Sequence, residues 1–192
     1  MRHVISALVM NEPGVLANVA NLFSARGFNI DSLVVGRTEN PELSRMTVVL
    51  DADENTLEQV RKQLAKLVPV VKVRDFAGTK YIERDLALVT VGVSAGNRSE
   101  VIEIVNLFRG KVVDVAKNSL IVELSGPEEK VEALIELLQP FGIKELARTG
   151  VIAMSRGTQN AKDEAAEKAP QTGGGKRKRS ISAPSAAALP PS

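Results

Sequence analysis

The order of the hydrophobic patterns is the feature that most constrains how this chain folds, because the same order occurs twice. Residues 3–10 form a short β-like run, and from Val15 the apolar residues change to the spacing of three and four that is typical of one helix face. The apolar positions on this face are Val15, Leu16, Val19, Leu22 and Phe23. Gly27 follows as a residue that ends helices, and residues 28–38 and 45–50 then read as a hairpin of two strands.

A second helix and a closing strand complete the first pattern. Asn55 and Glu58 resemble a capping box, and residues 70–76, after Pro69, read as a strand. The helical stripe between them consists of Leu57, Val60, Leu64 and Leu67. The order is therefore strand, helix, strand, strand, helix, strand.

The same order returns after a short polar break at residues 77–83. Asn97 and Glu100 predict the start of a helix, and the stretch SGPE, residues 125–128, predicts another with Pro in its first turn. The strands of this half are expected at residues 85–93, 111–116, 120–125 and 143–155.

We therefore predict an α+β protein of two ferredoxin-like βαββαβ domains, each a four-stranded antiparallel sheet with two helices on one face. The first domain is expected over residues 1–77 and the second over residues 78–157. From Thr158 the periodicity is lost and Ala, Lys, Gly, Pro and Ser dominate. Such a composition buries too little apolar surface to offset the entropy of ordering, so residues 158–192 are predicted to be a disordered tail.

Composition removes several classes of protein. The 192 residues include no Cys, which excludes disulfides and thiolate metal sites, and a single histidine, His3. No apolar run reaches the roughly 18 residues that cross a membrane, and the first residues read as mature structure rather than as a signal peptide. We expect a soluble, cytoplasmic protein with no membrane role.

Charge is distributed unevenly along the chain. Six basic and three acidic residues follow Gly157, so the tail carries a net charge of +3. Because the net charge of the whole chain is +2, residues 1–157 carry −1. The folded part thus lacks the basic character of nucleic-acid-binding domains, and we expect no nucleic-acid partner. The basic run Lys176–Arg179 has two interpretations, a localisation or nucleic-acid patch and ordinary solvated charge, of which the second is favoured.

The junction between the first strand and the first helix is the candidate site. The residues there are Asn11, Glu12, Pro13 and Gly14. The first N–H groups of a helix lack internal partners and attract a carboxylate, and a glycine allows a ligand to approach the backbone. The Asn11 amide both donates and accepts, which suits an amino-acid zwitterion. The alternative is an ordinary strand-to-helix turn.

Residues 10–50, MNEPGVLANVANLFSARGFNIDSLVVGRTENPELSRMTVVL, resemble the first domain of the regulatory small subunit of acetolactate synthase, also called acetohydroxyacid synthase. The runs NEPGVL, FSARGFNIDSL and LSRMT carry the resemblance in order and spacing. FRGKVVDV and ARTGVIAMSRG extend it to the second domain, so that it covers about residues 1–157.

The resemblance implies that the first domain is an ACT domain, a module that binds amino acids for feedback control. In this family two ACT domains pair across a homodimer, and the effector sites form at their interface. The effector implied is a branched-chain amino acid, usually valine and sometimes leucine or isoleucine. The matching positions are Asn11, Gly14, Val15 and Leu16 of one subunit, with Asn29 and Ile30 of its partner.

The second domain resembles the part of the family that docks and activates the catalytic large subunit, in branched-chain amino acid biosynthesis. That large subunit carries thiamine diphosphate, Mg²⁺ and usually FAD. The resemblance implies no cofactor, no metal and no catalytic residue for this chain, which is expected to be a non-catalytic regulatory subunit.

Two other functions compete with this one: a free-standing ACT-type amino-acid sensor acting on another target, and a nucleic-acid-associated protein acting through its tail. Two side-chain features also have structural alternatives. His3 begins a strand and is interpreted as a structural or surface residue. Asp51 and Asp53 have the spacing of a metal pair, but a turn and a helix cap are the favoured interpretation.

Overall fold

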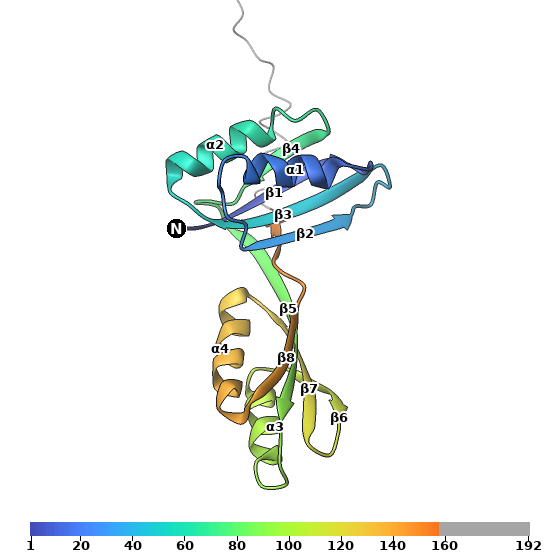
Figure 1. The fold of residues 1–192 in the computed structure, drawn as a ribbon, viewed down its shortest axis with the longest axis vertical. Coiled ribbons are helices and arrows are strands. Elements are labelled where there is room, and N and C mark those ends of the chain that lie inside the picture. The colour runs from blue at the N-terminus through green and yellow to red at the C-terminus, as the bar shows by residue number, and fades with distance from the viewer. Residues whose placement is uncertain (158–192) are drawn as a thin grey trace, which may run out of the picture.

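The computed structural model describes residues 1–157 and builds them into two sheet-and-helix units that follow one another along the chain (Figure 1). One long strand, β5, runs from the first unit into the second. The prediction of disorder and the two interpretations of the basic run Lys176–Arg179 concern residues 158–192, which lie outside the described residues.

The first unit has the predicted βαββαβ order. Its elements are β1 (Arg2–Met10), α1 (Val15–Ser24), β2 (Ser32–Arg37), β3 (Leu43–Asp51), α2 (Glu54–Leu64) and β4 (Val70–Asp75). The four strands form an antiparallel sheet in the order β2-β3-β1-β4, and both helices lie on one side of it (Figure 1).

The core of this unit lies between the sheet and its two helices. Ile5 and Ala7 of β1 pair with Val48 and Met46 of β3, so the alternating residues of both strands face the helices together. The helical stripes pack against them through Val15, Val19, Leu22, Phe23, Leu57, Val60 and Leu64. The apolar helical stripes predicted from the sequence therefore face this core, apart from Leu16.

The second unit repeats the order with more elements than predicted. These are β5 (Tyr81–Gly92), α3 (Arg98–Leu107), β6 (Lys111–Val115), β7 (Ser119–Gly126), α4 (Glu128–Leu138), a 3-10 turn (Gln139–Phe141), β8 (Ile143–Arg148) and β9 (Ile152–Ser155). Strands β6, β7, β5 and β8 lie side by side in that order and form an antiparallel sheet. The α+β class with two ferredoxin-like, ACT-type domains is confirmed.

The prediction of one final strand over residues 143–155 is wrong, because the strand ends at Arg148 and a second strand begins at Ile152. Gly150 has φ +83°, in the left-handed region that glycine adopts without strain, and this turn separates β8 from β9. Strand β9 then pairs with Tyr81–Arg84, the first part of β5. Residues 81–83, expected in a polar break, are therefore strand. We call the two paired segments, Tyr81–Arg84 and Ile152–Ser155, the junction ribbon.

The junction ribbon lies on the face of the first sheet that the helices leave open. Val151, next to the ribbon, and Ala153, within it, are buried against Val4 and Val49 of the first sheet and against Phe76. The Phe76 and Tyr81 rings add a tilted contact, with centroids 4.9 Å apart. A small apolar cluster thus joins the two units.

The interpretation of Asp51 and Asp53 as a turn and a helix cap is confirmed for the cap. Asp53 caps α2 by accepting a 2.6 Å hydrogen bond from the Thr56 N–H, so the cap is Asp53 and not the predicted Asn55. Asp51 pairs with the Met1 amino group. Within residues 1–157 no group of acidic or imidazole side chains has the arrangement of a metal site.

Candidate functional site

The loop between β1 and α1 is open at its glycine. Gly14 is the N-cap of α1 with φ +86°, and a Cβ built at this position would meet no atom within 4 Å. Within the part of the chain that the structure describes, no side chain caps the helix, and the Val15 N–H makes only a long, 3.4 Å bond with the Glu12 carbonyl. The positive end of α1 is therefore exposed beside a space that a ligand can enter.

Asn11 fixes this loop to the loop between β2 and β3. Its amide N–H donates to the Pro41 carbonyl at 3.0 Å, its amide oxygen accepts from the Ser44 hydroxyl at 3.1 Å, and its backbone N–H donates to Glu42. Among the described residues these bonds use one amide hydrogen and one lone pair of the side chain, so the group retains capacity for a ligand.

Val15 is buried, whereas Leu16 is exposed. The Val15 side chain belongs to the core of the first unit, which leaves only its backbone N–H for a ligand. Leu16 is 45% exposed, an apolar side chain directed away from the core beside the exposed helix end. An apolar contact at this site therefore comes from Leu16, whereas the sequence pattern treated both residues alike.

Asn29 and Ile30 lie beyond the other end of α1. The Asn29 amide donates to the Asp31 carboxylate at 2.9 Å, and Ile30 packs partly into the core. The ten residues of α1 span about 15 Å between this segment and Gly14. One chain therefore does not bring the two predicted groups of site residues together.

His3 has a structural environment. It is buried in β1, and its Nε2–H donates to the Ala52 carbonyl at 3.1 Å.

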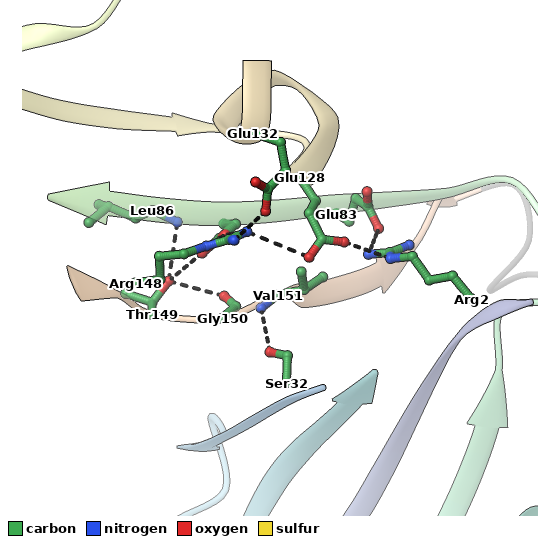
Figure 2. Close-up of polar contacts among 11 residues, drawn as sticks. Arg2, Ser32, Glu83, Leu86, Glu128, Glu132, Arg148, Thr149, Gly150 and Val151 are labelled. Carbon is green, nitrogen blue, oxygen red and sulfur yellow. Dashed lines mark hydrogen bonds and ion pairs between the residues drawn. The ribbon is translucent and has the colours of Figure 1, made fainter. Parts of the chain in front are cut away.

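A second polar cluster, which sequence reasoning missed, lies where the two units meet (Figure 2). The carboxylate of Asp85 is completely buried and accepts from the Arg148 guanidinium, with Nε at 2.7 Å from Oδ2. The Thr149 hydroxyl donates to the other Asp85 oxygen at 3.3 Å. Arg148 also pairs with Glu132 of α4.

Glu128, the first residue of α4, links the units electrostatically. One of its oxygens lies 2.6 Å from Nε of Arg2 in β1, and the other lies 3.5 Å from Nη2 of Arg148 (Figure 2). Burial disfavours the charged form of Arg148, but hydrogen bonds and charge from Asp85 and Glu132 outweigh it and raise its pKa. Arg148 therefore stays charged.

The sequence shows the charged residues of this cluster but not that they pair. Asp85 is an acidic residue at an inward position of β5, where the next inward residues are apolar, and Arg148 is the basic last residue of β8. Their separation of 63 residues left the pairing to the strand register, in which Arg148 lies opposite Ala87.

Models of protein families match both units. Residues 5–72 match an acetohydroxyacid synthase small subunit-like ACT domain, and residues 84–157 match the small subunit of acetolactate synthase. Among the described residues, no helix is long and apolar enough to cross a membrane.

Individual relatives match over most of their length. A probable acetolactate synthase small subunit of Archaeoglobus fulgidus is 50% identical over 83% of this chain and 99% of its own. The acetolactate synthase small subunit of Mycobacterium bovis is 52% identical over 81% of this chain and 92% of its own. The crystal structure of the small subunit from Thermotoga maritima superposes with a TM-score of 0.75 at 44% identity, and covers 81% of this chain and 98% of that one.

The fold and these matches define a class: proteins that join an N-terminal ACT domain to a second ferredoxin-like domain. Within that class, this chain belongs to the family of acetolactate synthase small subunits. The resemblance seen in the sequence is confirmed, and membership implies a catalytic large subunit as partner.

We predict that the buried pair behaves as one unit in folding. Arg148→Met leaves the Asp85 carboxylate buried without its cation, and we expect the free energy of unfolding to fall by about 3 kcal/mol. The double variant Asp85→Leu with Arg148→Met removes both charges and regains most of that loss. Urea unfolding of the wild type, both single variants and the double variant measures the coupling.

Additive losses would contradict this account, because independent residues show no coupling energy. Glu132→Gln serves as the control, since its side chain is about half exposed and an exposed ion pair contributes little.

Proposed function

We propose that this chain is the regulatory subunit that activates the catalytic subunit of acetolactate synthase and confers feedback inhibition by valine. The observation that carries the proposal is the match to small subunits through both units, with about half of the residues identical. In this proposal the second unit docks the catalytic subunit, and the first unit binds the effector.

The chemistry of the β1–α1 loop supports a carboxylate ligand. The helix end provides N–H groups and partial positive charge beside Gly14, where an added Cβ would meet no described atom within 4 Å. Asn11 has amide capacity for the ligand's polar groups, and the exposed Leu16 provides an apolar wall for a branched side chain.

A second subunit completes the proposed site. Asn29 and Ile30 lie about a helix length from Gly14 within one chain, so they reach a ligand at the loop only from another copy. We therefore propose a homodimer through the ACT domains, in which Asn29 of the partner subunit binds polar atoms and Ile30 of the partner subunit covers the apolar end.

The catalytic chemistry belongs to the large subunit in this proposal. Thiamine diphosphate, Mg²⁺ and FAD are assigned to that partner, and the complex is placed in the cytoplasm, in the biosynthesis of valine, leucine and isoleucine. This chain contributes docking, activation and control.

The direct test is reconstitution. We expect the purified chain alone to produce no acetolactate from pyruvate, and we expect it to raise the activity of the catalytic subunit from the same organism when the two are mixed. Turnover by the isolated chain, or a catalytic subunit that neither binds nor responds to it, would refute the proposal. In the second case, an amino-acid sensor with another target becomes the better description.

Gly14→Asp should abolish valine inhibition while activation persists. A carboxylate here would repel the ligand's carboxylate by on the order of 4 kcal/mol at about 4 Å and an effective dielectric near 20. Even a screened third of this energy weakens valine binding about tenfold. A valine titration of the reconstituted enzyme measures the half-inhibitory concentration.

Gly14→Asn is the matched control, because Asn has nearly the same volume as Asp, tolerates the left-handed conformation equally and carries no charge. A large difference between Asp and Asn assigns the effect to charge. Asn29→Ala should weaken inhibition more mildly, by about 0.5–1.5 kcal/mol for each hydrogen bond lost. Equal half-inhibitory concentrations for wild type and Gly14→Asp would remove this loop from the site.

A further inference from the structure

The segment that carries Asn29 and Ile30 continues directly into the contact between the two units. Ser32, two residues after Ile30, accepts a hydrogen bond from the Val151 N–H at 3.2 Å (Figure 2). A Cβ at Gly150 would lie 2.5 Å from the Ser32 hydroxyl and 2.9 Å from Cγ2 of Val34. The backbone of Gly150 therefore packs directly against Ser32 and Val34 of β2, and a larger residue at position 150 would have to displace these side chains.

Polar contacts continue from Gly150 into the second unit. The single hydroxyl hydrogen of Thr149 has two acceptors in reach, the Gly150 carbonyl at 3.0 Å and the Asp85 carboxylate at 3.3 Å, and the hydroxyl oxygen accepts from the Leu86 N–H at 3.2 Å. Asp85 holds Arg148, which pairs with two glutamates of α4. A continuous series of contacts thus runs from Ser32 to the first turns of α4.

The interface is fixed on one side and open on the other. The junction ribbon is anchored in the apolar cluster around Phe76. Beside Ser32 and Gly150, by contrast, lies a cleft of about 280 Å³ that is also lined by Asp31, Glu128 and Arg148. The Asp31–Ser32 segment therefore has room to shift away from Gly150 while Ala153 and Phe76 stay packed on the first sheet.

We propose that the contact between Ser32 and the Gly150–Val151 backbone couples effector binding to the second unit, and that the effector acts by holding this contact closed. This inference rests on the proposed function, because it assigns a route to the valine response. An effector bound to Asn29 and Ile30 orders the segment that ends at Ser32. That segment then fixes Gly150, and through Thr149 and Arg148 it fixes α4 in the arrangement that lowers activity. A ligand shifts such an equilibrium only by its different affinity for the two arrangements, and the closed contact provides that difference.

Two variants open the contact in different ways. Ser32→Ala removes the hydrogen-bond acceptor and adds no atoms. Gly150→Ala inserts a methyl group at the position that Ser32 and Val34 already occupy, in a backbone conformation that disfavours it. Ser125→Ala, at an exposed serine in β7, is the control for the first variant. Gly142→Ala is the control for the second, because Gly142 has φ +86° and its added Cβ meets no atom within 4 Å.

The test separates binding from inhibition. Calorimetry with valine and the free chain gives the dissociation constant, and titration of the reconstituted enzyme gives the ratio of activity without valine to activity at saturating valine. For Ser32→Ala we expect a dissociation constant within about threefold of wild type and a ratio reduced about three- to tenfold, as expected for one hydrogen bond. We expect Gly150→Ala to reduce the ratio further, and both controls to match wild type.

The possible outcomes distinguish the two proposals. Variants that bind valine and are inhibited as strongly as wild type overturn the coupling contact and leave the proposed function intact. Loss of valine binding by the free Ser32→Ala chain also overturns it, because Ser32 would then act at the effector site itself. A wild-type complex that valine does not inhibit refutes the proposed function, and the coupling contact falls with it.

Discussion

The arrangement of this protein depends on a ribbon of two short strands that belongs to the second unit but packs on the first. Val151 and Ala153 cover Val4 and Val49 on the face of the first sheet opposite its helices. An uncovered sheet face with these apolar residues would expose them to water, and their burial holds the two units in one relation. The ion pair between Arg2 of β1 and Glu128 of α4 depends on that relation, whereas Asp85, Arg148 and Glu128 all belong to the second unit.

Most of the fold could be predicted from the sequence, because alternation and helical spacing are local properties. The strand around Met46 and the helix around Val60 were both placed by the positions of their apolar residues. The junction was not predictable in this way. Residues 143–155 read as one continuous strand, and only the left-handed turn at Gly150 divides them into β8 and β9, which pair with different parts of β5.

The candidate site shows the same division between local and long-range information. The glycine at the start of α1 and the amide of Asn11 follow from the loop sequence. The position of Asn29 beyond the far end of the helix also follows locally, because Gly27 is expected to end the helix before it, and this position explains why a site that uses both segments requires two chains. The sequence does not show that Val15 is buried while Leu16 is exposed, because that depends on tertiary packing.

The central claim is that the β1–α1 loop and the contact between Ser32 and Val151 respond together to a branched-chain amino acid. Amide hydrogen exchange of the reconstituted complex, with and without saturating valine, tests this most directly, because it reports local opening at individual backbone groups. The account predicts that valine slows exchange at Gly14–Leu16 and at Val151, whose N–H donates to Ser32, and leaves the β6–β7 hairpin unchanged. Protection confined to other parts of the chain, with unchanged exchange at both of these places, would contradict it.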